Sequence, residues 1–137
     1  MPSRRSKPLF ASAITGALLA AGAAAAWQYQ QGQDHLRQRA EAISGGSATR
    51  GKQLFVSYGC GGCHQLNGIP QAHGQVGPPL QGLGSRAFIA GKLENRPDNL
   101  RLWIQHPQVV SPGTAMPDLG ITPSQTRDLA AFLYTKS

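Results

Sequence analysis

The sequence predicts an all-α domain in the C-terminal part of the chain, because three separate segments carry helical patterns. Residues 49–57 place small and apolar side chains on one side of a helix. The stretch "RPDNLRLWIQHP" has a proline at the first helical position, followed by apolar residues at helical spacing. A third helix is expected from Thr122 towards the C-terminus. The connecting segments are rich in glycine and proline, which is typical of loops.

Local signals start and stop these helices. Pro107 ends the second helix, since the residue before a proline disfavours helical geometry. Thr122 and Gln125 have the spacing of a capping box at the start of the last helix, with Pro123 at its first position. The apolar faces of these two helices consist of Leu100, Trp103, Ile104, Leu129, Phe132 and Leu133.

Residues 1–27 resemble an export segment. The start "MPSRRSK" is basic and contains no acidic residue, and the run from Leu9 to Trp27 carries no charge. Small residues at Ala24 and Ala26 fit an A-x-A cleavage site, which predicts a signal peptide. The uncharged run is also just long enough to span a bilayer, which predicts a retained membrane anchor.

Two features favour the retained anchor over the cleaved signal peptide. Trp27 and Tyr29 stand where the aromatic belt of a membrane helix would lie, and basic residues flank only the inner end. Residues 28–47 are polar with little core-forming content, so we expect a tether. With either outcome, residues 48–137 are exported as one domain.

The chain has a net charge of +7, but the distribution of its basic residues argues against a nucleic-acid-binding function. The basic residues are scattered and do not form a patch, and an exported protein rarely meets nucleic acid, so we expect no nucleic-acid partner. A modest positive surface favours encounters with acidic proteins. A solvated surface without a directed role accounts for the same charge equally well.

Both cysteines of the chain lie in "YGCGGCHQLNG", at Cys60 and Cys63, with His64 directly behind them. A Cys-x-x-Cys disulfide would close a very short loop and stabilise little, and the βαβ pattern of a thioredoxin-type pair is missing. No further cysteine exists to complete a zinc site. The remaining interpretation of C-x-x-C-H is covalent attachment of one c-type haem through two thioether bonds. The two thiols reach one porphyrin, and His64 binds its iron.

Such a haem takes a second axial ligand, and the best candidate is Met116 in "SPGTAMPDLG". Apart from Met1 it is the only methionine of the chain. Its loop, rich in proline and glycine, suits a side chain held against a flat ring better than it suits a core position. His73 and His106 are the competing ligands. His106 precedes Pro107 and is expected to end a helix, whereas His73 is expected on an exposed loop.

With these residues in place, the segment 48–137 resembles the single-haem class I cytochromes c of bacteria. The stretch "GKQLFVSYGCGGCH" is similar to the first helix and haem motif of that family. The stretch "VGPPLQGLG" is similar to its Gly-Pro-x-Leu segment, and "PGTAMP" to its methionine loop. The resemblance implies a small class I cytochrome c fold, with three to five short helices around one covalently bound haem c.

The resemblance also implies roles for single residues. Pro78 corresponds to the proline whose carbonyl accepts the Nδ1–H of the haem histidine, although Pro79 leaves two carbonyls to choose from. Leu80 would pack on the proximal side of the haem. Trp103 would lie beside the macrocycle and donate to a propionate, or would serve only as the largest residue of a helical core face. The residues expected where the first and last helices cross are Gly51, Phe55, Phe132 and Tyr134.

These features predict an electron-transfer protein, which carries one electron at a time in a respiratory chain and acts on no small-molecule substrate. The expected partners are redox proteins at the periplasmic side of the inner membrane: a terminal oxidase, or a membrane dehydrogenase or reductase. In the alternative hypothesis, the chain is a fixed haem c subunit of such a complex. A third hypothesis, a five-coordinate haem that binds peroxide or a gas, requires that Met116 does not ligate.

Overall fold

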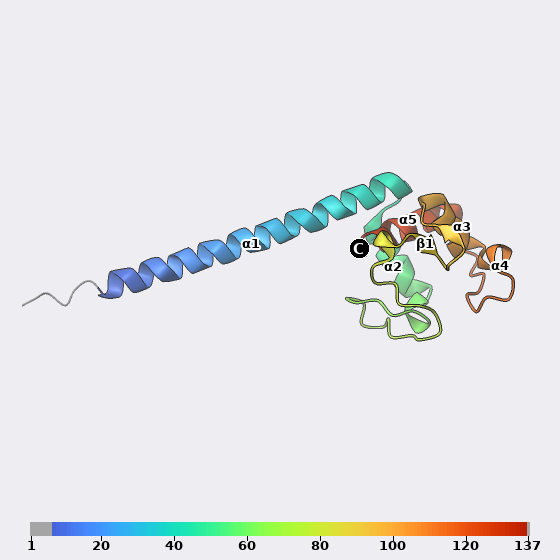
Figure 1. Cartoon of the computed structure of the whole chain (residues 1–137), viewed down its shortest axis with the longest axis horizontal. Coiled ribbons are helices and arrows are strands. Elements are labelled where there is room, and N and C mark those ends of the chain that lie inside the picture. Colours follow the sequence, from blue (N-terminus) through green and yellow to red (C-terminus); the bar gives the residue numbers. More distant parts are fainter. Residues whose placement is uncertain (1–6, 137) are drawn as a thin grey trace, which may run out of the picture. The chain divides into compact units, whose positions relative to one another are not determined.

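The computed structural model describes residues 7–136, and within that range the chain is mostly helical (Figure 1). Two 3₁₀ turns and one antiparallel hairpin lie between the helices. The elements are α1 (Lys7–Ser44), α2 (Ala48–Ser57), the 3₁₀ turns Cys60–Gly62 and Leu83–Ser85, β1 (Phe88–Ile89), β2 (Leu93–Glu94), α3 (Pro97–Gln105), α4 (Pro107–Val110) and α5 (Pro123–Tyr134). This confirms the predicted all-α class.

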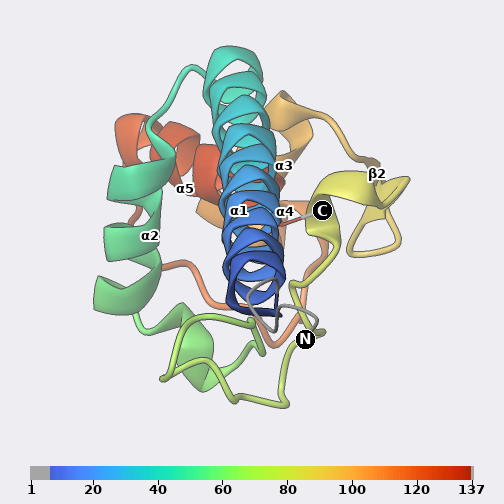
Figure 2. The same ribbon diagram turned by 90° about the vertical axis from the view of Figure 1, so that its left-hand side faces the viewer.

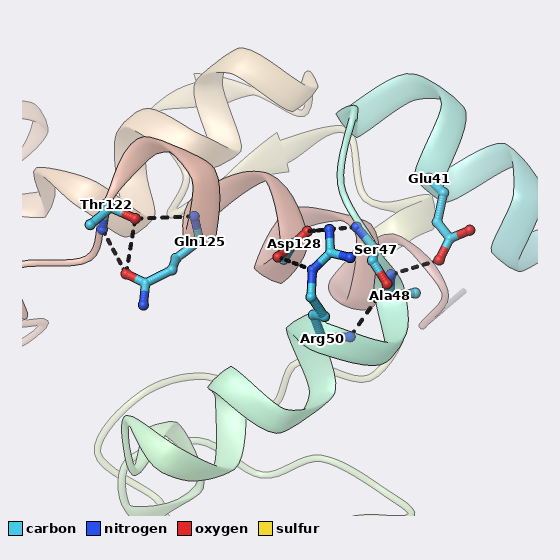
Figure 3. Close-up of polar contacts among 7 residues, drawn as sticks. All are labelled: Glu41, Ser47, Ala48, Arg50, Thr122, Gln125 and Asp128. Carbon is cyan, nitrogen blue, oxygen red and sulfur yellow. Dashed lines mark hydrogen bonds and ion pairs between the residues drawn. The ribbon is translucent and has the colours of Figure 1, made fainter.

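The three predicted helices correspond to α2, α3 and α5. Helix α3 begins at Pro97 and ends before Pro107, as the two prolines predict. At the start of α5 the Thr122 hydroxyl accepts from the N–H of Gln125 at 3.3 Å, and the Gln125 side chain lies 3.0 Å from the N–H of Thr122 (Figure 3). This confirms the capping box. The hairpin and the single turn of α4 were not predicted, because such short elements carry no periodic pattern.

Helix α1 contains both the uncharged run and most of the polar stretch behind it. Internal contacts divide the chain into two compact units, and the boundary in the sequence lies between His35 and Leu36. Within the second unit, Ala40 and Ser44 are buried, with 2% and 3% of their surface exposed, and lie one helical turn apart on the same face. The polar stretch 28–47, predicted as a tether, is therefore helical up to Ser44, and its last turns are part of the packed domain.

In the first unit, the side chains of α1 between Ala13 and His35 are exposed, including Trp27 and Tyr29. Among residues 7–136, no helix is both long and apolar enough to cross a bilayer. Arg4 and Arg5, which belong to the predicted export segment, lie outside the described residues.

The core of the second unit forms where α2 packs against α5, and the two helices lie side by side in both views (Figures 1 and 2). The rings of Phe55 and Phe132 meet with their centroids 5.7 Å apart, in a tilted arrangement that aromatic pairs favour. Gly51 makes the approach possible, since a Cβ there would lie 1.9 Å from the backbone oxygen of Asp128 and 2.7 Å from Cβ of Phe132. The predicted crossing is thus confirmed for Gly51, Phe55 and Phe132.

Tyr134, also expected at the crossing, connects α5 to the middle of the chain. Its hydroxyl donates to Oδ1 of Asn95 at 2.9 Å, and the Asn95 amide donates to the carbonyls of Leu83 and Arg86 at 2.8 Å each. Burial raises the pKa of Tyr134 to about 12. The phenol therefore keeps its proton at neutral pH and holds this segment against the last helix.

A buried carboxylate ties the start of α2 to α5 (Figure 3). Asp128 accepts from the N–H of Ser47 at 2.7 Å and from the guanidinium of Arg50 at 2.8 and 2.9 Å. The N–H of Ala48 donates to Glu41 of α1 at 2.8 Å. Side chains of α1 and α5 thus bind N–H groups that the start of a helix leaves without backbone partners. Burial raises the pKa of Asp128, but its bonds to Arg50 and Ser47 outweigh burial and hold this pKa below the usual value.

Replacing Asp128 with asparagine is expected to lower the free energy of unfolding at pH 7 by about 1–2 kcal/mol, because the charged acceptor of these bonds is lost. The pKa of Asp128 is lower in the folded chain than in the unfolded chain. Its contribution is therefore fully present above the unfolded pKa of about 3.9 and disappears as the pH falls through the folded pKa. Denaturant unfolding at a series of pH values should show the two proteins converge at acid pH.

The control for this experiment is Asp98→Asn, which removes the exposed ion pair between Asp98 and Arg101. Exposed pairs of this kind contribute little, so its stability should stay close to that of the wild type. A deficit of Asp128→Asn that remained constant at every pH would contradict the role assigned to the ionised carboxylate.

Candidate haem-binding site

The two cysteines lie in a tight turn that follows α2. Gly59 adopts a left-handed φ of 68°, which glycine tolerates, and the chain continues as the 3₁₀ turn Cys60–Gly62. Neither Cys60 nor Cys63 forms a disulfide. Burial raises the pKa of the Cys60 thiol to about 11, so at neutral pH this thiol is protonated and a poor nucleophile for disulfide formation.

His64 follows the turn, and a proline carbonyl fixes its imidazole. Nδ1 lies 2.8 Å from the backbone oxygen of Pro78. Because a carbonyl can only accept, Nδ1 carries the hydrogen, and in the neutral imidazole Nε2 is then the nitrogen with the lone pair. The carbonyl of Pro79 instead accepts from Arg86 at 2.5 Å. Of the two prolines considered, Pro78 therefore orients His64, and the second ring nitrogen remains able to bind a metal.

Gly77 provides the space in which the imidazole lies. A Cβ on residue 77 would be 2.3 Å from Cε1 and 2.5 Å from Nδ1 of His64. The N–H of Gly77 donates to the carbonyl of Cys63 at 2.8 Å, which draws this backbone against the cysteine turn. Gly77 belongs to the Gly-Pro-x-Leu segment, but no role was predicted for it from the sequence. The available signal was a glycine directly before two prolines, a place where a backbone can pass close to another group.

Met116 lies in the irregular segment between α4 and α5, as its loop composition predicts. The side chain is half-buried. Gly113 turns the chain with a φ of 81°, a left-handed value that favours glycine. The methionine is thus held in a loop and is not part of a helical core face.

His64 and Met116 both lie on the walls of one cavity of about 720 Å³, which Cys60 and Cys63 also line. Cofactor sites typically measure about 300–1,000 Å³. Most of the remaining wall is apolar and includes Leu80, Leu83, Leu100, Ile104, Ile121 and Leu133. Two thiols, an imidazole with a free nitrogen and a thioether in apolar surroundings are the groups that a covalently attached haem needs.

The other predicted site residues divide between the cavity and the surface. Leu80 is buried and Trp103 is half-buried, and both line the cavity. Trp103 also packs against the hydrophobic core, so both interpretations of this residue are compatible with its position. Neither His73 nor His106 is among the described residues that line the cavity. His73 is exposed. His106 directly follows α3, and its Nδ1 lies 3.8 Å from Oδ1 of Asp118.

A small helical domain with a C-x-x-C-H turn and a methionine on one apolar cavity defines the class of proteins that attach haem covalently. The model of the cytochrome c family matches residues 48–137, and the chain belongs to this family. The match confirms the predicted resemblance to class I cytochromes c. Haem c is the cofactor of the family, in agreement with the predicted cofactor.

Three curated proteins, each named cytochrome c oxidase subunit 2, are similar to part of the chain. Identity is 41% over 70 residues with the protein of Alkalihalophilus pseudofirmus, 35% over 71 with that of Bacillus sp. strain PS3, and 28% over 91 with that of Bacillus subtilis strain 168. The matches cover 51%, 50% and 65% of this chain but 20%, 20% and 26% of the relatives. The chain therefore spans about a fifth to a quarter of the length of these relatives. No solved structure matches the chain.

Proposed function

We propose that this protein transfers single electrons through one haem c, with His64 and Met116 as the axial ligands. The observation that carries the proposal is that these two side chains, from distant parts of the sequence, line one apolar cavity. Cys60 and Cys63 line the same cavity at the spacing that covalent attachment requires.

The residues present fit the cofactor. Cys60 and Cys63 would hold the porphyrin through thioether bonds, and Nε2 of His64 and the sulfur of Met116 would bind the iron. The Pro78 carbonyl keeps the imidazole in the tautomer that this requires. When bound, the haem supplies an iron that changes between the ferrous and ferric states.

Two ligating side chains favour electron transfer over bond chemistry. With His64 and Met116 both bound to the iron, a substrate or a gas would find no open position on the metal. A thioether ligand raises the reduction potential relative to a second imidazole, and apolar walls limit the access of water. These properties support an electron carrier without a small-molecule substrate, and disfavour the hypothesis of peroxide or gas binding.

Replacing Met116 with alanine tests the proposal. The ferric wild-type holoprotein should show the weak far-red absorption band of sulfur-to-iron charge transfer, because a thioether is bound. Met116→Ala should lose this band, and its ferrous form should bind carbon monoxide readily, because one axial position is open. Absorption spectra with and without carbon monoxide measure both effects.

The matched controls are His73→Ala and His106→Ala, which remove the competing ligands. Both variants should keep the band and remain unreactive towards carbon monoxide. If the wild type lacked the band, or if a histidine variant lost it while Met116→Ala kept it, the proposed ligand pair would be incorrect.

We further propose that the electron acceptor is a terminal oxidase at the periplasmic side of the inner membrane. Similarity of about half of the chain to proteins named cytochrome c oxidase subunit 2 supports this partner. Residues 48–137 carry eight basic and four acidic side chains, a net charge of +4, which favours encounter with an acidic partner surface. In this proposal residues 1–27 export the domain and retain it at the membrane, where tethering raises its effective concentration near the oxidase.

A second candidate function is a fixed haem c subunit within a larger oxidase, dehydrogenase or reductase complex. This candidate is supported by the fact that the similar stretches are parts of much longer oxidase subunits. Isolation of native membranes separates the two candidates. Release of the protein by salt or during mild detergent purification is expected for a mobile carrier. Stoichiometric co-purification with a catalytic subunit would instead establish the fixed subunit.

A further inference from the structure

Gln108 of α4 binds three backbone groups of the methionine loop with one side chain. Its amide nitrogen donates to the carbonyl of Thr114 at 2.8 Å and to the carbonyl of Met116 at 2.9 Å. Its amide oxygen accepts from the N–H of Gly113 at 3.1 Å. The orientation of the amide is unambiguous, because the flipped amide would set its oxygen against two carbonyl oxygens.

The methionine loop receives little support from its own backbone. Between α4 and α5 the described chain forms no helix or strand. The N–H of Thr114 donates to the carbonyl of Ser111 at 3.1 Å, and the N–H of Met116 reaches the Thr114 hydroxyl only at 3.5 Å. The contacts from Gln108 therefore account for a large share of the hydrogen bonds that hold this backbone in place.

Gln108 is itself attached to a rigid part of the domain. It follows Pro107, which is among the most completely buried residues and fixes the first position of α4. Helix α4 follows α3 after the single residue His106, and Leu100 and Ile104 of α3 line the apolar cavity. The glutamine thus connects a fixed element of the cavity wall to the loop that carries Met116.

From this geometry we infer that Gln108 is a positioning residue that keeps the Met116 thioether at the haem iron. The inference rests on the proposed role of Met116 as a ligand. Because Gln108 holds the carbonyl of the ligand residue itself, loss of its bonds lets the loop open locally while the rest of the domain stays folded. Since thioether ligation raises the reduction potential, Gln108 also helps to keep that potential high.

The test compares Gln108→Ala with the wild type as full-length holoproteins. The variant should exchange the Gly113 amide hydrogen faster, show a weaker far-red sulfur-to-iron band and have a lower reduction potential. Carbon monoxide should bind its ferrous form about tenfold faster or more, because two or three hydrogen bonds no longer oppose opening of the loop. Gln53→Ala, at an exposed position of α2, is the control and should match the wild type in all four measurements.

Gln108→Glu distinguishes positioning of the ligand from general stability. The glutamate has nearly the same size and can still accept from Gly113, but its carboxylate cannot donate to the carbonyls of Thr114 and Met116. Its second carboxylate oxygen would instead lie against these two carbonyl oxygens, so the Gly113 amide should exchange faster, and carbon monoxide binding and the far-red band should change, as they do in Gln108→Ala. This variant also carries the test if Gln108→Ala does not accumulate as a folded protein.

Three results would separate the possible failures. A wild type with the far-red band, together with Gln108 variants whose band, potential and carbon monoxide binding are unchanged, would overturn the role of Gln108 and leave the proposed function intact. A lower unfolding free energy without any of these changes would overturn it equally, because the glutamine would then be only structural. A wild type without the band would overturn the ligation by Met116 on which the inference rests.

Discussion

Replacing Gly77 with alanine is expected to displace His64 and to remove most of the correctly ligated protein. The new Cβ would lie 2.3 Å from Cε1 and 2.5 Å from Nδ1 of the imidazole, well inside van der Waals contact. Neither group can move freely, because His64 is hydrogen-bonded to the carbonyl of Pro78 and the N–H of Gly77 is hydrogen-bonded to the carbonyl of Cys63. We expect a loss of about 3 kcal/mol or more in unfolding free energy, because overpacking is accompanied by loss of at least one of these hydrogen bonds.

The yield of holoprotein, its absorption spectrum and its denaturant unfolding measure this effect. Val76→Ala is the matched control in the same loop, because the side chain of Val76 is 68% exposed and its truncation creates no clash. That variant should have a normal spectrum and nearly normal stability. If Gly77→Ala had the spectrum and stability of the wild type, the close approach of residue 77 to the imidazole would be incorrect.

Replacing Gly51 with alanine is expected to have a comparable effect on the fold. The Cβ would lie 1.9 Å from the backbone oxygen of Asp128, so a change of side-chain rotamer cannot relieve the clash. Helices α2 and α5 would have to separate, which would weaken the contact between Phe55 and Phe132 as well as the bonds that Asp128 makes. We expect a loss of about 3 kcal/mol or more, a large share of the 5–15 kcal/mol by which domains are usually stable.

Gly32→Ala, in the middle of α1, is the control for this helix substitution. A Cβ there has no neighbour within 4 Å, and alanine forms helix better than glycine by about 0.5–1 kcal/mol. Because Gly32 lies in the first unit, outside the haem domain, this domain of the Gly32→Ala variant should unfold at the same denaturant concentration as in the wild type. Gly51→Ala should shift this midpoint clearly downwards. An unchanged midpoint would show that α2 and α5 do not approach as closely as Gly51 allows.

Local chemistry made several features of this protein predictable from its sequence. The spacing of Cys60, Cys63 and His64 indicates covalent haem attachment because all three lie within one turn of chain. The ends of α3 and α5 follow from residues adjacent to each end, such as Pro107 and the capping box at Thr122. In these cases the interacting groups are a few positions apart, so their geometry depends little on the rest of the fold.

Features that join distant segments were less predictable. The sequence favoured Pro78 for the hydrogen bond to His64 but left the carbonyl of Pro79 open, and the paths of the two backbones decide for Pro78. The polar stretch before residue 48 was expected to be a tether, yet its last helical turns pack on the domain through Ala40 and Ser44. Neither result has a sequence pattern. The choice between two adjacent carbonyls depends on the backbone paths, and Ala40 and Ser44 are buried by their neighbours and not by strong hydrophobicity of their own.

The sequence by itself determined the haem-attachment motif, the helical class and the identity of the candidate ligands, because these depend on residue types at short spacing. Only the tertiary structure brought His64 and Met116 to one cavity and placed Gly77 against the imidazole. It also placed Gln108 against the backbone of the methionine loop. These contacts depend on where separate segments lie once the core has packed, and such distances are set by the whole fold and not by any one stretch of sequence.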